Sequence, residues 1–329
     1  MERVINWGIL GPGKIADKFA SAFSVTPKAR LVAVGSRDGE RAKEFAAKFS
    51  IPKVHASYEA LAADPDVDIV YVATPHSFHH EQTILCLNHK KAVLCEKPLT
   101  LNLPSALTMV AAAEANNVFL MEGMWSRFFP AIIKTVELIA KGTIGEVQFI
   151  RADFGFVFPF DSESRVYNIN LAAGAQLDVG IYPMFLALLI LGKPERIQAL
   201  AQHAPTGIDQ TTSVQFLFKN KSMAHIFSSV VVDTAKQAEI IGTMGTIILH
   251  APWYKTQAIT VKLNNGTSSH FDFPFEGFGF QYQLQHVTEC LLNGLKESPL
   301  MSFDFSFLMA EVADSILAQC DVVYPHHFS

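Results

Sequence analysis

The sequence is poor in cysteine and in charge. Its four cysteines, at positions 86, 95, 290 and 320 of 329, form no Cys-x-x-Cys pair and no metal-ligand spacing. We therefore expect reduced, buried thiols in a cytoplasmic protein and no metal site. Charged residues make up 17%, the formal net charge is −5, and no basic run is present. This composition argues against nucleic acid or a membrane as a partner.

Long apolar runs and targeting segments are also lacking. The N-terminal "MERVINWGIL" has neither the charged lead-in nor the cleavage site of a signal peptide. The run "IYPMFLALLILG" (181–192) is shorter than the roughly 20 residues that span a bilayer. We find no internal repeat. A hydrophobic content of 50% over this length instead predicts two globular domains.

Strand and helix patterns alternate over the first third of the chain. The predicted strands cover residues 4–10, 31–36, 67–74, 91–96 and 118–123, and the helices cover 15–23, 41–49, 78–88 and 104–116. Such alternation is typical of a doubly wound parallel sheet, the Rossmann architecture. We therefore expect an α/β dinucleotide-binding domain over residues 1–122.

The pattern changes after residue 123. Val214, Phe216 and Phe218 alternate with polar neighbours, which is the period of a half-exposed antiparallel strand. Strands are predicted at 146–156, 196–203, 211–219, 222–232, 237–250 and 258–263, and helices at 131–141, 182–191, 280–293 and 306–319. Residues 123–329 are thus expected to form an α+β domain with a large, mostly antiparallel open sheet.

A glycine turn joins the first predicted strand to the first predicted helix. Gly11-x-Gly13-x-x-Ala16 fits a dinucleotide fingerprint, in which bare backbone and the start of the helix, Lys14 and Ile15, face the phosphates. The alternative is an ordinary tight turn. The position of the motif in a strand–helix–strand unit favours the cofactor interpretation.

The end of the second strand indicates which cofactor is used. NAD sites usually carry an acidic residue there, whereas this chain has Ser36 and Arg37, which suit a 2′-phosphate. In the alternative, Arg37 is a solvated cation and Asp38 supplies the acidic group for NAD. Asp38 fits better as the cap of the next helix. The sequence therefore favours NADP, with NAD possible.

Two further strands end in unusual sequences. The strand at 67–73 leads into Thr74, Pro75, His76 and His79, which we expect beside the nicotinamide half of the cofactor, although a polar cluster on a surface helix would look similar. The next strand ends at Glu96 and Lys97. A lysine there is usually only solvated, but strand ends of such a sheet face the ligand crevice.

Four motifs in order resemble one family over essentially the whole chain. They are "GILGPGKIA", "VATPHSFHH", "CEKPL" and "AGAQLDVGIYP", and they are similar to the glucose–fructose oxidoreductase and inositol dehydrogenase superfamily. The segments "SRDGERAKEFAAKF", "AVLCEKPLT" and "FLMEGMWSRFFP" resemble its branch of trans-1,2-dihydrobenzene-1,2-diol and D-xylose dehydrogenases. That resemblance implies NADP, a substrate-binding second domain and a homodimer formed through the exposed face of the second domain's sheet.

The resemblance also implies catalytic residues. Lys97 matches the family's active-site lysine, and Asp178 and Tyr182 match its other catalytic groups. The chain departs from the family where Tyr182 replaces the histidine of inositol dehydrogenases, where Ala173 precedes Gly174, and where His76 replaces an asparagine. Tyr182 argues against close kinship with the inositol dehydrogenases, and we expect the changes at Ala173 and His76 to affect the shape of the substrate pocket.

The expected reaction moves a hydride between a nicotinamide and a secondary alcohol or hemiacetal carbon of a sugar or cyclic diol. Tyr182 is predicted to act as the acid–base group, Lys97 to hold the substrate oxygen, and Asp178 to orient the substrate or Lys97. Alternatively, Lys97 could carry the proton. A phenol has an ordinary pKa near 10, and a neighbouring ammonium favours its ionised form.

Aromatic residues could line the substrate pocket. We expect two aromatic side chains, Trp125 and Phe154, to contact the substrate because aromatic faces stack on rings. The neighbouring Arg127 is a further candidate contact. The alternative is that they are core residues with one solvated cation, and the same ambiguity applies to Phe128, Phe129, Phe156, Phe158, Phe160, Phe278 and Phe280.

Two rival functions stay open at this point. The superfamily resembles some non-catalytic, NADP-responsive regulators, but those tend to lose the lysine or its partners. A deoxysugar or inositol-type keto-reductase that recycles a bound cofactor is the other alternative.

Overall fold

The computed structural model describes residues 3–325 of the chain. The chain divides into two compact units, one formed by Met1–Trp125 with Glu276–Phe307 and the other by Ser126–Phe275 with Leu308–Ser329. We call these the first and the second unit. The long helix α9 (Phe303–Gln319) begins in residues of the first unit and continues in residues of the second.

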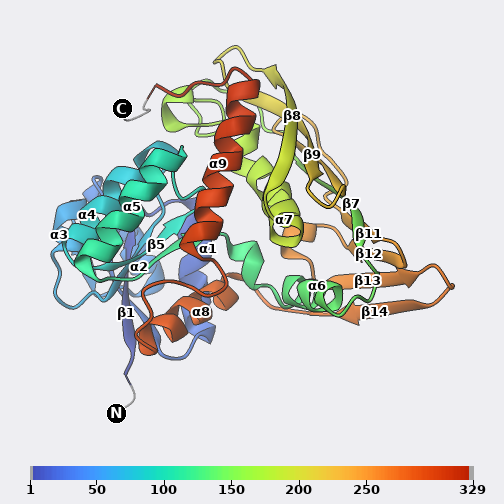
Figure 1. The fold of residues 1–329 in the computed structure, drawn as a ribbon. Helices are drawn as coiled ribbons and strands as arrows, with labels where there is room; N and C mark the ends of the chain where they lie inside the picture. Colours follow the sequence, from blue (N-terminus) through green and yellow to red (C-terminus); the bar gives the residue numbers. More distant parts are fainter. Residues whose placement is uncertain (1–2, 326–329) are drawn as a thin grey trace. The chain divides into compact units, whose positions relative to one another are not determined.

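The first unit contains a six-stranded parallel sheet with strand order β3-β2-β1-β4-β5-β6 (Figure 1). This is the order of a dinucleotide-binding doubly wound fold, in which ligands bind where the order reverses, between β1 and β4. The central strand β4 is buried along its whole length, as a strand covered on both faces requires. The strands are β1 (Ile5–Leu10), β2 (Ala29–Gly35), β3 (Lys53–His55), β4 (Ile69–Val72), β5 (Ala92–Glu96) and β6 (Leu120–Gly123).

Three helices of this unit, α2, α3 and α5, begin at polar capping residues. The side chains of Asp38, Ser57 and Asn102 accept backbone N–H groups of the first turns of α2, α3 and α5 at 2.8–3.1 Å. The helices are α1 (Lys14–Ala20), α2 (Gly39–Phe49), α3 (Tyr58–Ala62), α4 (His79–Asn88), α5 (Leu103–Asn116) and, from the distant C-terminal part, α8 (Phe280–Leu292).

The second unit is built on an eight-stranded sheet with strand order β14-β13-β12-β11-β7-β10-β9-β8. Its strand pairs are antiparallel except for β7 with β10. Helices α6 (Pro130–Ala140) and α7 (Ile181–Leu191) lie along one face (Figure 1). The strands are β7 (Val147–Gly155), β8 (Pro194–His203), β9 (Asp209–Phe218), β10 (Met223–Ser229), β11 (Ala238–Gly242), β12 (Gly245–Leu249), β13 (Ala258–Leu263) and β14 (Ser268–Asp272).

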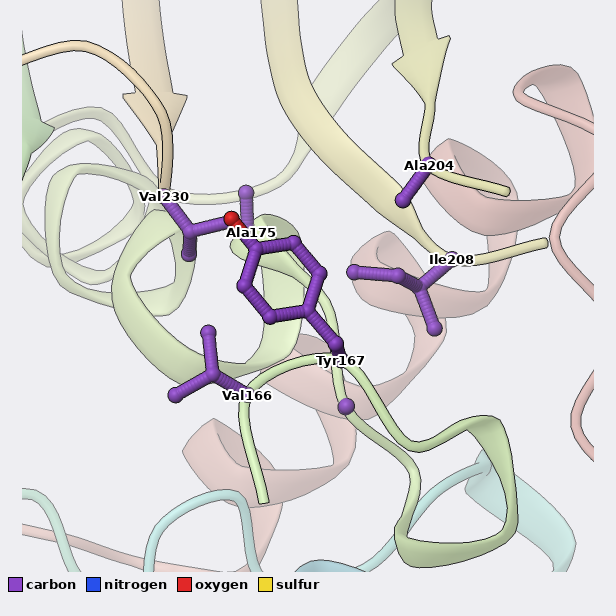
Figure 2. Close-up of a cluster of buried hydrophobic side chains, with 7 residues drawn as sticks. Val166, Tyr167, Ala175, Ala204, Ile208 and Val230 are labelled. Carbon is purple, nitrogen blue, oxygen red and sulfur yellow. The ribbon is translucent and has the colours of Figure 1, made fainter. Parts of the chain in front are cut away.

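A small apolar cluster in the second unit fixes the chain that precedes α7. The ring of Tyr167 lies among the side chains of this cluster (Figure 2). Its hydroxyl donates to the Phe158 carbonyl at 2.9 Å. The cluster consists of Val166, Tyr167, Ala173, Ala175, Ala204, Ile208 and Val230. It anchors the loop between β7 and α7 to the start of β9 and the end of β10.

The predicted fold class is confirmed, and the differences are local. Strand β3, helix α3 and strand β14 were not expected; the first two have three and five residues, and β14 is an exposed edge strand without apolar alternation. The run predicted as one strand over 237–250 is the hairpin of β11 and β12.

Within residues 3–325, one segment passes the length and hydropathy criteria for a membrane span. The segment Ile169–Leu191, which includes α7, has a mean hydropathy of 1.7 over its most apolar window. This helical segment is longer than the apolar run at 181–192. Because 83% of that window is buried inside the protein, the segment has the burial of a core helix.

Candidate active site

The glycine turn follows β1 and closes against the residue that follows β4. Gly11 has φ +88°, a conformation that favours glycine, and a Cβ there would lie 2.7 Å from Thr74 Cγ2. The Gly11 N–H donates to the Gly35 carbonyl at 3.1 Å. The turn therefore lies where the strand order reverses, in contact with the ends of both β2 and β4.

The residues around this turn fit a dinucleotide phosphate. Among the described residues, a Cβ on Gly13 would meet only Arg41 Nη2, at 3.9 Å, so the backbone is bare on that side. Helix α1 starts directly after it, at Lys14 and Ile15. The buried hydroxyls of Thr74 and Ser77 have no hydrogen-bond partner in the described part of the chain. Bare backbone and unpaired hydroxyls are what a bound pyrophosphate and ribose would use.

The end of β2 carries Ser36 and Arg37, and Asp38 is engaged elsewhere. The Asp38 carboxylate accepts the Arg41 N–H at 3.1 Å, so Asp38 is the helix cap that the sequence favoured. Arg37 is exposed, and its guanidinium lies 5.8 Å from the Tyr58 ring and 5.4 Å from the Phe78 ring. Such cation–π contacts orient the guanidinium while leaving its N–H groups available.

Arg41 is a cationic residue that sequence reasoning missed. Its Nε donates to the Pro12 carbonyl at 2.8 Å, which ties α2 to the glycine turn. The side chain reaches the turn from the first turn of a helix 29 residues away, and only the folded β1–α1–β2–α2 unit brings the two together. With Arg37 and Lys14 it adds positive charge around the expected phosphates.

His79 connects the loop after β4 to the turn that carries Lys97. It is fully buried, with Nδ1 2.7 Å from the Pro98 carbonyl oxygen and Nε2 2.9 Å from the Thr74 carbonyl oxygen. Burial lowers the pKa of His79 to about 4, so the ring is neutral near pH 7 and donates its one N–H to one of these carbonyls. His76 lies beside it, with ring centroids 5.7 Å apart. His79 is thus not on the helix surface; it holds the two loops together.

Glu96 and Lys97 lie at the end of β5, among buried carboxyl groups. The hydroxyl of Tyr71 donates to Glu96 Oε1, and Tyr71 stacks on Phe19 of α1 at 3.9 Å. Lys97 is largely buried rather than solvated, and Pro98 follows it through a cis peptide. The packing of β4 on α1 therefore fixes the residue that precedes Lys97.

Glu122 is a second buried carboxyl group near Lys97, and the sequence did not single it out. Its Oε1 accepts the Leu99 N–H at 3.0 Å and its Oε2 accepts the Ser306 hydroxyl at 2.8 Å. Burial raises the pKa of Glu122 to about 7; the negative charge of Glu96 also raises it, and the positive charge of Lys97 opposes the shift. Glu122 therefore holds the turn two residues beyond Lys97.

Trp125 belongs to the first unit, where it stacks on an aromatic residue of α8. The Trp125 and Phe280 rings are nearly parallel, with centroids 4.5 Å apart, and Phe280 contacts Phe19 edge-on. This arrangement corresponds to the core alternative for Phe280. Phe278 is partly exposed and lies under the Lys18 ammonium at 5.4 Å.

In the second unit, Asp178 and Tyr182 lie one turn apart on a continuous helical segment. Asp178 is in a π-helical turn, Gln176–Gly180, and Tyr182 is in the first turn of α7. Turns of this kind are frequent at functional sites. Both side chains are buried, and Arg165 Nη1 lies 3.1 Å from Asp178 Oδ2. Arg165 is a further residue that the sequence did not indicate, since it comes from a loop without periodicity.

Aromatic rings surround Tyr182 within this unit. Phe154 lies 5.4 Å from the Tyr182 ring and stacks on Tyr254 at 4.1 Å, and Tyr254 lies 5.6 Å from Tyr182. Phe154 was predicted as a substrate contact, whereas Tyr254 was missed because nothing near it in the sequence suggests a site. The three rings form a surface suited to stacking on a flat or cyclic ligand.

The remaining predicted residues have mixed environments. Arg127 is buried, and burial lowers its guanidinium pKa, so it is not a solvated cation. Phe128 and Phe129 are buried core residues. Phe156 and Phe158 pack against the cluster of Figure 2, and Phe160 is exposed.

The four cysteines are unpaired and buried, as expected. Within residues 3–325, no three His, Cys, Asp or Glu side chains come together as metal ligands do.

The structure thus groups the predicted residues into two sets. In the first unit it brings together Gly11, Gly13, Lys14, Ile15, Ser36, Arg37, Thr74, Pro75, His76, His79, Glu96, Lys97 and Trp125 around the carboxyl ends of β1, β2, β4, β5 and β6. In the second unit it brings Phe154 close to Tyr182, with Asp178 one turn before.

Comparison with known proteins matches both units. Residues 5–124 match the family described as "Oxidoreductase family, NAD-binding Rossmann fold", and residues 132–248 match the "GFO/IDH/MocA C-terminal domain". Trans-1,2-dihydrobenzene-1,2-diol dehydrogenase of Xenopus laevis is 39% identical over 97% of this chain and 99% of its own. The human protein of that name is 35% identical over 98% of both chains.

Solved structures with the same fold include an aldose oxidoreductase and a ketoreductase. The aldose–aldose oxidoreductase of Caulobacter crescentus, crystallised with glycerol, has a TM-score of 0.88 and 26% identity over 97% of this chain and 98% of its own. A 3-ketoreductase of Actinomadura kijaniata, crystallised with NADP and TDP-benzene, has a TM-score of 0.86 and 25% identity over the same shares.

Proposed function

Because the chain belongs to the GFO/IDH/MocA family of oxidoreductases, we propose that it is an NADP-dependent dehydrogenase of a sugar or cyclic diol. The family resemblance inferred from its motifs is confirmed, and with it the assignment as a dehydrogenase of CH–OH groups. The finer points, which are the cofactor, the catalytic pair and the substrate class, are our proposal.

The charge at the end of β2 supports NADP. Ser36 and Arg37 stand where an NAD site usually carries a carboxylate, and the Asp38 carboxylate is occupied as a helix cap. Arg41 contacts the glycine turn through the Pro12 carbonyl, and Arg37 is exposed at the end of β2, so the two can supply positive charge for the pyrophosphate and a 2′-phosphate. The related 3-ketoreductase was crystallised with NADP.

In the proposed mechanism, a bound nicotinamide supplies the hydride acceptor. Tyr182 takes the proton of the substrate hydroxyl while the carbinol carbon of the substrate becomes a carbonyl. Lys97 holds the substrate oxygen. A neighbouring ammonium favours the ionised form of a phenol, which makes it a better base at neutral pH. Asp178, paired with Arg165, orients the substrate hydroxyls.

The rings around Tyr182 support the proposed substrate class. Phe154 and Tyr254 present stacked aromatic faces, which suit a pyranose or a cyclic diol. Relatives of this chain are named as dehydrogenases of a cyclic dihydrodiol and as an aldose oxidoreductase. A ring that carries vicinal hydroxyls is common to both.

The test is turnover of variants with a panel of aldoses and trans-dihydrodiols. Lys97→Met and Tyr182→Phe should each lower kcat by about 10²–10⁴-fold, the usual contribution of an acid–base group, with NADPH binding unchanged by fluorescence titration. Lys43→Met, an exposed lysine of α2, is the control and should behave as wild type. Full activity of either catalytic variant would refute the pair, and NADPH binding without turnover on any substrate would favour a regulatory protein.

A further inference from the structure

A buried carboxylate holds the start of the segment that carries Asp178 and Tyr182. Oδ2 of Asp209, the first residue of β9, accepts the Gln176 N–H at 2.6 Å and the Thr212 hydroxyl at 2.7 Å. Gln176 opens the π-helical turn that leads into α7. The first N–H groups of a helix have no partner within the helix, so an outside acceptor fixes where this one begins.

Both ends of this contact are themselves fixed. Ala175 precedes Gln176 and Ile208 precedes Asp209, and both belong to the apolar cluster around Tyr167 (Figure 2). Asp209 and Gln176 are almost completely buried. The hydrogen bond is thus made inside a packed core, where its geometry is maintained.

Gly174 gives the carboxylate room at this place. Its φ is +130°, which favours glycine, and a Cβ there would lie 2.2 Å from Asp209 Oδ1. The Gly174 carbonyl in turn accepts the Asp178 N–H at 3.1 Å. The Asp209 side chain therefore contacts the segment at two places. Its Oδ1 leaves no room for a side chain at residue 174, and its Oδ2 accepts the N–H of Gln176, which opens the helical turn.

The charge on Asp209 suits this position. Burial raises the pKa of Asp209 to about 6, whereas the hydrogen bonds from Thr212 and Gln176 and, to a smaller extent, His203 lower it. Tyr324 and Cys320 are the other titratable groups that its charge affects. The two hydrogen bonds that Oδ2 accepts thus favour the carboxylate form. A negative charge at the start of a helix is favourable.

We infer that Asp209 is a positioning residue, which holds Asp178 and Tyr182 in the geometry that the reaction needs. This inference rests on the proposed function. Asp209 acts through the backbone of Gln176, whose N–H its carboxylate accepts. A displacement of about 1 Å at a catalytic group can lower the rate about 100-fold.

The experiment compares three variants by kcat, NADPH affinity and hydrogen exchange of residues 174–182. Asp209→Ala should lower kcat by about 10- to 100-fold and leave the Kd for NADPH within about twofold, because the first unit is untouched. Asp209→Asn keeps an acceptor oxygen and should restore kcat to within about threefold. Thr212→Val removes the other donor to the same oxygen and should also stay within about threefold.

Hydrogen exchange gives a readout that does not depend on turnover. The amides of residues 176–182 should exchange faster in Asp209→Ala than in wild type and Thr212→Val. If Asp209→Ala does not fold, Gly174→Ala, which displaces the carboxylate, should show the same loss of kcat and protection.

Two results would overturn the inference: a folded Asp209→Ala protein with wild-type kcat, or equal losses in Asp209→Ala and Thr212→Val, which would indicate general damage to packing. If wild type turns over no sugar or diol, the proposed function fails, and unchanged exchange in Asp209→Ala would independently reject the anchoring.

Discussion

Buried titratable residues near Lys97 make the first unit sensitive to pH. Glu122 and Glu96 are both buried carboxyl groups, and the pKa of Glu122 is raised to about 7 chiefly by burial. A folded state that holds this proton more tightly than the unfolded chain gains stability at low pH. The gain is complete below the ordinary pKa of 4.5 and is lost as the pH rises through about 7.

Glu122→Gln should therefore become more stable relative to wild type as the pH rises. The substitution removes the buried charge that wild type acquires above pH 7, so the difference in unfolding free energy should change between pH 5 and pH 8 by up to roughly 3 kcal/mol. Urea denaturation at the two pH values measures it. Exposed Glu195→Gln is the control, and parallel pH profiles for Glu122→Gln and wild type would contradict the assignment.

Individual residues also show which parts of the candidate site could be predicted from the sequence and which could not. Lys97, Asp178 and Tyr182 could be named because they lie in motifs with a recognisable pattern. Arg41, Arg165 and Tyr254 could not, because each reaches its place through the fold from a segment without such a pattern. The role of Asp209 could not be predicted for the same reason, because its hydrogen-bond partner Gln176 lies 33 residues away in the chain.

The turn between β2 and α2 is the element on which the proposed preference for NADP rests. It places the Arg37 guanidinium between the Tyr58 and Phe78 rings and uses Asp38 as the helix cap. A charge-assisted contact with a phosphate typically contributes about 1.5–3 kcal/mol.

Arg37→Ala should raise the Kd for NADPH about 10- to 100-fold and change that for NADH little, because only NADPH carries the 2′-phosphate. Fluorescence titration of both nucleotides measures this. Arg30→Ala, an exposed arginine of β2, is the matched control. Tighter binding of NADH than NADPH to wild type would contradict the proposed preference.

Elements with strong periodicity could be predicted, and elements that depend on distant contacts could not. The buried strand β4 and the glycine turn before α1 have local signals, a continuous apolar run and two glycines. Helix α8 was expected, but its amphipathic pattern does not say which sheet it covers. It packs on β1, β2 and α1 of the first unit, from more than 240 residues away in the chain. The expected division at residue 122 stays a prediction.

At the scale of the whole molecule, one face of the eight-stranded sheet is relevant to the oligomeric state. Leu217, Met223, Phe149 and Ile241 are register partners in a row across β9, β10, β7 and β11. Each is at least partly exposed, whereas the adjacent row that includes Phe216, Ala224, Ile150 and Ile240 is buried. A row of apolar side chains on an open sheet face suits a second copy of the same chain.

We propose a homodimer through this face, as the family resemblance implied. Light scattering should give about 72 kDa, twice the 36.2 kDa of the chain. Met223→Asp should shift the protein toward the monomer mass, because a charge in the row would be buried on association. Val25→Asp, at an exposed apolar residue of the first unit, should not. A monomeric wild type would reject the dimer.

The burial of all four thiols has a practical consequence. Burial raises the pKa of Cys86 to about 12 and that of Cys290 and Cys320 to about 11, and it raises that of Cys95 as well. Since only a thiolate attacks electrophiles readily, the native enzyme should resist alkylating and oxidising reagents. The first unit contains Cys86, Cys95 and Cys290, and the second contains Cys320. Labelling of the thiols followed by peptide mapping would therefore reveal which unit opens first when the protein is heated.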